Sequence, residues 1–174
     1  MIGKIIMPLG SLALLALLAG CTGAAPSGDG AQAVGVPMNT PSVADVAAIL
    51  KDQGHNPKIQ SDDSGAPMLL VNEDGDNFMV GFYDCTKGGG LAARRCTGAE
   101  FSVSYPAKTK PTLSRINEMN QSYRMAKAYV NDEGNPGISM AVNLGGAFSS
   151  GNLTDSLEWW TAAMRQFEED IGWN

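Results

Sequence analysis

The hydrophobic pattern is clearest near the C-terminus, where apolar residues return every three or four positions. This spacing places their side chains on one face of a helix. We therefore expect a long final helix that packs through this face against a core or against another helix. The residues of the stripe are Leu153, Leu157, Trp160, Met164, Phe167 and Ile171.

Two further helices are predicted upstream. Ser42 followed by Asp45 is typical of a helix N-cap with an acid in the first turn, and the helix that starts there is expected to end at Gly54. A middle helix is predicted over residues 113–129. Its expected packing side holds Leu113, Ile116, Asn120, Tyr123 and Lys127.

Strands are predicted wherever apolar residues alternate with other residues or form a short run. A short strand is expected around 58–61, followed by strands over 67–72, 78–85 and 96–105, and by a hairpin with arms at 130–133 and 138–144. Strands grouped in hairpins favour an α+β fold with an antiparallel sheet and three packing helices. We predict the order α-β-β-β-α-β-β-α.

The N-terminus carries an export signal. Lys4 precedes an apolar run from Ile5 to Leu18, about 14 residues long, whereas a membrane span needs roughly 20. Leu18-Ala19-Gly20-Cys21 resembles the lipobox of bacterial lipoproteins. That resemblance implies cleavage before Cys21 and lipidation of its thiol, which would anchor the protein to a membrane outside the cytoplasm. A signal peptide without lipidation is the alternative.

The expected organisation has three parts. Residues 1–20 form the lipoprotein signal peptide, residues 21–41 the lipidated cysteine and a flexible linker, and residues 42–174 one α+β domain. The linker prediction rests on its Gly, Ala, Pro and Ser content, which cannot bury enough apolar surface to become ordered. In a Gram-negative host, Thr22 resembles the residue that sorts lipoproteins to the outer membrane, facing the periplasm.

The net charge of the chain limits the classes of partner that it can bind. The chain has 12 Lys and Arg against 18 Asp and Glu, and loss of residues 1–20 removes only Lys4, which leaves a formal charge of −7. An acidic chain without a basic stripe repels nucleic acid phosphates, so we exclude nucleic acid as a partner.

The remaining cysteines, Cys85 and Cys96, form an expected disulfide. Export would place them in an oxidising compartment, and their spacing is not the C-x-x-C of redox catalysts. A zinc site is the competing interpretation, but it lacks further ligands, because His55 is the only histidine. We predict a structural disulfide, and neither a metal nor a cofactor.

Several short motifs together resemble the YbjN-like family of bacterial sensory transduction regulators. They are Gly81-Phe82-Tyr83-Asp84-Cys85, Cys96 with the Phe101 strand, Ile116-Asn117-Glu118-Met119-Asn120, Arg124 to Tyr129, and Leu157-Glu158-Trp159-Trp160. Met119 stands where similar members carry tryptophan. The resemblance implies a fold like that of type III secretion chaperones, which often dimerise, and it supplies no catalytic residues. Many members look cytosolic, so the export signal is a departure.

No catalytic constellation stands out. A Ser-His-Asp or Cys-His arrangement would have to use His55, which is expected in a solvated loop. The acidic runs at 62–63 and 73–76 lack the ligand spacing of an EF-hand and are typical of turns. We therefore expect a protein that is not an enzyme.

Three groups of residues are candidates for binding. Arg94 and Arg95, near three glycines of the loop between the cysteines, would either hold an anion or belong to a solvated hairpin loop. Asn117, Asn120 and Arg124 share one side of the predicted middle helix and would either line a polar groove or satisfy backbone groups internally. Trp159, like Trp173, lies off the apolar stripe and could contact a partner or pack against the fold.

These features favour a non-catalytic module of the cell envelope that binds an envelope protein, with a homodimer as a further expectation. The alternatives are a sensor for a small ligand or peptide and, less favoured, a hydrolase that uses carboxylates alone.

Overall fold

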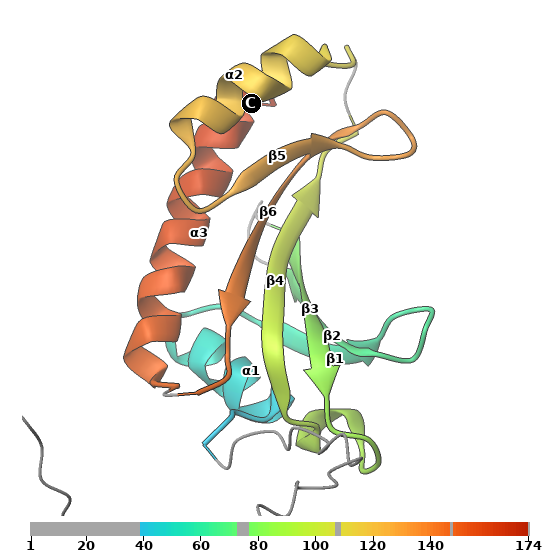
Figure 1. The fold of residues 1–174 in the computed structure, drawn as a ribbon, viewed down its shortest axis with the longest axis vertical. Helices are drawn as coiled ribbons and strands as arrows, with labels where there is room; N and C mark the ends of the chain where they lie inside the picture. Colours follow the sequence, from blue (N-terminus) through green and yellow to red (C-terminus); the bar gives the residue numbers. More distant parts are fainter. Residues whose placement is uncertain (1–38, 73–76, 107–108, 147, 174) are drawn as a thin grey trace, which may run out of the picture. The chain divides into compact units, whose positions relative to one another are not determined.

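The alternating segments build one six-stranded antiparallel sheet in the computed structural model, which describes residues 39–72, 77–106, 109–146 and 148–173 (Figure 1). Residues 1–38, which hold the expected signal peptide, Cys21 and most of the linker, and residues 73–76 lie outside the described residues. The end of the expected flexible linker is ordered instead, because Thr40 is fully buried and its carbonyl accepts a hydrogen bond from Arg95. The strand order is β1-β2-β3-β4-β6-β5. The strands are β1 (Pro57–Ser61), β2 (Pro67–Asn72), β3 (Asn77–Cys85), β4 (Cys96–Ser104), β5 (Lys127–Val130) and β6 (Pro136–Asn143).

Three α-helices complete the domain: α1 (Val43–Asp52), α2 (Leu113–Ser122) and α3 (Ser150–Ile171), with a short 3-10 turn, η1 (Leu91–Ala93). The α+β class is confirmed. Four strands rather than three precede α2, because the short strand expected around 58–61 joins the sheet as the edge strand β1.

The apolar stripe of α3 forms the centre of the core. Leu153, Leu157, Trp160, Met164 and Phe167 are all buried, and Ile171 is half-buried. The Trp160 ring lies 5.8 Å from that of Phe78 on β3 and 5.9 Å from that of Phe101 on β4. The stripe therefore packs against the sheet, and this favours the core-face interpretation of its spacing over a helix–helix seam.

The start of α1 has the predicted cap. Ser42 Oγ accepts a hydrogen bond from the Asp45 amide at 3.1 Å, and the Ser42 amide donates to Asp45 Oδ2 at 2.8 Å. This reciprocal pair satisfies amides that the first helical turn leaves without partners. The hydrogen bonds from Ser42 also hold the pKa of the Asp45 carboxyl below its usual range.

The predicted end of the middle helix is wrong. α2 stops at Ser122, Tyr123 has an extended backbone with ψ 126°, and Lys127–Val130 forms β5 instead of the last helical turn. The helical spacing of Tyr123 and Lys127 is overridden because residues 127–130 pair with residues 136–139 of β6. Arg124 therefore lies in the link between α2 and β5, not on the helix beside Asn117 and Asn120.

Asn120 forms hydrogen bonds within the domain. Its side-chain Nδ2 donates to the Ala128 carbonyl at 3.1 Å, and its Oδ1 accepts from the Ala128 amide at 2.7 Å. The side-chain amide thus takes the place of a neighbouring strand on the outer edge of β5. This geometry supports the internal role for Asn120 and explains why a poor helix former occupies α2.

Replacing Asn120 with alanine is expected to lower the free energy of unfolding by about 2 kcal/mol, because both backbone groups of the buried Ala128 lose their partner. Asn117→Ala is the matched control. Asn117 is exposed on the same helix, so its replacement should cost nothing or stabilise slightly through helix propensity. Urea unfolding of both variants measures the difference, and equal stabilities would contradict this role for Asn120.

In the part of the chain that the structure describes, no helix is both long and apolar enough to cross a membrane. α3 has the length, at 22 residues, but its face away from the core carries charged residues. Most of its large apolar residues pack against the sheet, and Trp159 is the exposed one.

Candidate functional site

A groove lies between α3 and two neighbouring segments, the end of β6 and the link from α2 to β5. It consists of two hollows, of about 500 Å³ and about 370 Å³, and both are lined by Met125 and Trp159. The larger hollow is bounded by residues 140–143 of β6, by Phe148 and by the first turns of α3. The smaller one lies between α3 and the link of residues 122–126. We call the two together the Trp159 groove.

Trp159 and Met125 are the large exposed apolar side chains of the groove. Trp159 precedes the fully buried Trp160 on α3, and one helical step turns it away from the core, so that it is 52% exposed. Met125 is 58% exposed because the chain has left α2 and has not yet entered β5. Large exposed apolar residues next to each other mark surfaces that bind partners.

The charges around the groove are mostly acidic. Asp155 lines the larger hollow and Glu158 the smaller one, both from exposed positions on α3. Arg124 lines the smaller hollow from the opposite side. The α3 side of the groove therefore favours basic groups in a ligand.

The face of the sheet away from α3 also carries exposed apolar residues, Met79 and Tyr83. The Tyr83 hydroxyl donates a hydrogen bond to Glu100 Oε2 at 2.8 Å, and this bond raises the pKa of Tyr83 to about 12. Tyr129 covers Gly137 closely, since a Cβ on Gly137 would lie 2.5 Å from the Tyr129 ring. Tyr83 and Tyr129 on this face thus make contacts within the domain.

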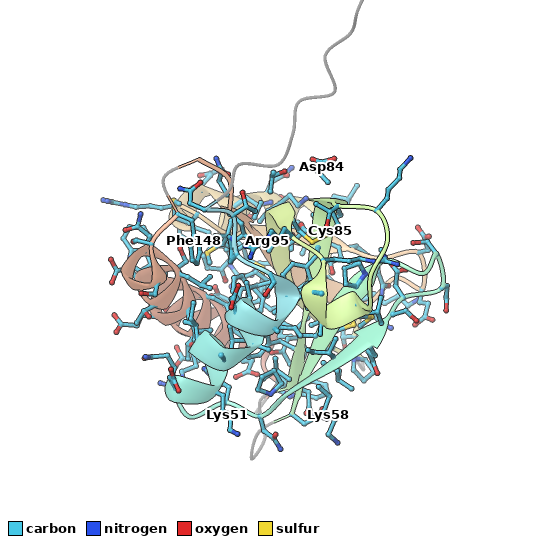
Figure 2. The ribbon with its side chains drawn as sticks, turned by 90° about the horizontal axis from the view of Figure 1, so that it is seen from below. Lys51, Lys58, Asp84, Cys85, Arg95 and Phe148 are labelled. Carbon is cyan, nitrogen blue, oxygen red and sulfur yellow. A yellow bond between two sulfur atoms is a disulfide. The ribbon has the colours of Figure 1, made fainter. Side chains whose placement is uncertain are left out.

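Cys85 and Cys96 form a disulfide that joins directly opposed residues of β3 and β4, with Cα atoms 3.9 Å apart. It lies where the β3–β4 hairpin ends, with the neighbouring Asp84 pointing outward (Figure 2). Asp84 has a φ of 51°, in the left-handed region, next to the disulfide.

The two arginines of this hairpin use their guanidinium groups on backbone carbonyls. Arg94 Nη1 donates to the Gly65 carbonyl at 3.0 Å, and Arg95 Nη1 donates to the carbonyl of Thr40. Both contacts tie the hairpin to neighbouring segments. The geometry therefore supports a structural role for them more than an anion site.

The structure separates the remaining candidates. Asn117 lies on the exposed side of α2, whereas Arg124 and Trp159 both line the smaller hollow. The Trp173 ring packs against that of Tyr105 at 4.9 Å. Sequence reasoning missed Met125 and Phe148 as groove residues, because their positions depend on where α2 and β6 end.

No metal-binding or catalytic site is evident among the described residues. No group of three or more His, Cys, Asp or Glu side chains that could bind a metal occurs within these ranges. His55 is half-buried, and its ring meets that of Phe78 edge-on at 5.7 Å. This position is typical of a packed histidine, and we assign it no catalytic role.

The family follows from the match over the folded region. Residues 42–173 match the model of the YbjN family, described as "putative bacterial sensory transduction regulator". The chain therefore belongs to the YbjN family. No curated protein and no solved structure matches the chain.

Proposed function

We propose that this protein is a lipid-anchored, non-catalytic module of the cell envelope that binds another envelope protein through the Trp159 groove. The observation that carries the proposal is that two exposed apolar side chains, Trp159 and Met125, line both hollows of the groove. Tryptophan is enriched among residues that dominate binding energy. Methionine adapts its shape to varied apolar surfaces.

Two features support the location. The Leu18-Ala19-Gly20-Cys21 string supports lipidation at Cys21, and several acyl chains together hold a protein firmly to a membrane. The Cys85–Cys96 disulfide fits an oxidising compartment outside the cytoplasm. In a Gram-negative host, we expect an outer-membrane anchor that faces the periplasm.

A small-ligand sensor is the second candidate. The larger hollow, at about 500 Å³, falls within the usual range of small-molecule sites. Sites for small molecules are enclosed and bury most of the ligand. The two large apolar residues of this hollow are about half exposed, and this favours a macromolecular partner. A homodimer is a further possibility that the same experiment detects.

The test is crosslinking in intact cells, followed by capture of the tagged full-length chain and mass spectrometry. We expect the wild-type chain to capture a stoichiometric envelope protein, and Trp159→Ala to lose it. Cys21→Ser should lose its acyl chains, so that labelled palmitate no longer enters the captured chain. Met79→Ala is the matched control, because Met79 is 43% exposed but lies on the face of the sheet away from the groove.

Three results would count against the proposal. Equal capture by Trp159→Ala and wild type would remove the groove from the account. Self-crosslinks without another protein would favour a homodimer or a small-ligand sensor. Equal incorporation of labelled palmitate into Cys21→Ser and wild type would exclude the lipid anchor at Cys21.

A further inference from the structure

Strand β6 is longer than the strand that covers its outer edge. β5 pairs with β6 from Val130 opposite Pro136 to Lys127 opposite Ser139. β6 continues to Asn143, paired with β4 along its other edge. Within the described ranges, residues 140–143 therefore have a strand on one side only. Figure 1 shows β6 running on past β5, with α3 on the uncovered side.

The backbone direction on this edge follows from the ladder. The Leu144 amide donates to the Thr97 carbonyl at 2.8 Å, on the β4 side. Backbone groups of successive residues in an antiparallel strand point to opposite edges. The amide and carbonyl groups of Ala141 and Asn143 therefore point away from β4. Both residues line the larger hollow of the Trp159 groove.

In the described part of the chain, no strand covers this edge, whereas the neighbouring edge of β5 is covered. On β5, the outward amide and carbonyl of Ala128 are both bound by the Asn120 side chain. Proteins commonly cover sheet edges in this way, because an open edge is a template for another strand. The exposed edge at residues 140–143 lies directly beside an apolar groove. A strand from a partner could therefore pair with this edge.

We infer that the Trp159 groove binds an extended polypeptide segment that adds as a strand beside residues 140–143 of β6. The inference rests on the proposed binding function and specifies its partner. Backbone groups of the segment would pair with Ala141 and Asn143, and alternate side chains would reach Met125 and Trp159. This is the β-augmentation mode of peptide recognition, in which main-chain bonds give affinity and side-chain hollows give specificity.

The chemistry of the groove favours a peptide over an apolar small molecule. A strand supplies both donors and acceptors at the spacing of the β6 edge. An apolar molecule would cover these backbone groups and leave them unpaired, which is costly. Asp155 and Glu158 on the α3 side further favour basic residues in the segment.

The first test selects peptides from a random twelve-residue display library on the full-length chain in detergent micelles. We expect selected peptides to alternate apolar residues and to carry lysine or arginine. Each peptide is then resynthesised with N-methyl groups on one or the other alternate set of amides. Blocking the set that faces β6 should weaken binding about tenfold or more, while the other set should leave it unchanged.

The second test changes the protein. Ala141→Pro removes an amide that points away from β4, so the β4–β6 ladder keeps its hydrogen bonds. Ala141→Ser is the matched control, because it keeps the amide. We expect Ala141→Pro to lose peptide binding and Ala141→Ser to retain it, with circular dichroism to check folding. The methylated peptides test the same contact if the proline variant does not fold.

The inference is overturned if the library yields no binder, if both methylated sets bind equally, or if folded Ala141→Pro binds like wild type. Binding of a small apolar compound in the groove without any peptide binder would also overturn it. The proposed function can hold even if this inference fails. If cells still yield a partner that depends on Trp159 but not on the Ala141 amide, the groove binds proteins by another mode.

Discussion

Replacing Trp160 with alanine is expected to lower the free energy of unfolding by about 3–5 kcal/mol, the usual cost of removing a large buried aromatic side chain. Trp160 is 0% exposed and contacts the rings of both Phe78 and Phe101. Its removal leaves a cavity between α3 and the middle of the sheet. Since small domains are stable by about 5–15 kcal/mol, this one change removes much of the total.

Trp159→Ala is the matched control for this prediction. The neighbouring tryptophan is half exposed and outside the apolar stripe, so its replacement should change stability by no more than about 0.5 kcal/mol. Chemical denaturation of both variants measures the difference, with Trp160→Phe as a milder change if the alanine variant does not fold. Comparable losses in the two alanine variants would mean that the core is not centred on Trp160.

Removing the disulfide is expected to cost about 3 kcal/mol, because the Cys85–Cys96 link restricts the unfolded chain. The double variant Cys85→Ala and Cys96→Ala should therefore unfold at lower urea concentration. It should also show a steeper dependence on urea, since its unfolded state exposes more surface. Urea curves of the wild type with and without reductant provide the same comparison without a mutation.

The control for the disulfide is the double variant with reductant. Its curve should not move, because no disulfide remains to be reduced. A wild-type curve that is also unchanged by reductant would contradict the prediction that the disulfide stabilises the fold.

Local patterns predicted the ends of the domain well. The α1 cap needs only Ser42 and Asp45 within one turn, and the α3 stripe repeats over the whole helix. Both signals are short-range, so the sequence contains them in full. The strand alternation at Phe78, Val80 and Phe82 is likewise local, and it places these residues in the core.

The middle of the domain could not be predicted in the same way. Lys127 continues a helical spacing from Asn120, but the pairing of residues 127–130 with β6 determines the structure there. This pairing competes with the helix and depends on a strand that comes later in the chain. The Asn120 contact with Ala128 could not be predicted for the same reason, because the edge of β5 must form before a side chain can cover it.

The candidate site was only partly predictable for the same reason. Trp159 stands out because it falls beside the α3 stripe, and this holds from spacing alone. The rest of the groove depends on where α2 stops and where β5 begins. These boundaries expose Met125 and leave residues 140–143 of β6 without a second neighbour in the described structure.

The most direct test of the central claim is photo-crosslinking in cells from a benzoylphenylalanine residue at position 159. The same residue at position 79, on the other face of the sheet, serves as the control. The account predicts one discrete crosslinked envelope protein from position 159 and none from position 79. No crosslink from position 159, or the same products from both positions, would contradict a binding site at the Trp159 groove.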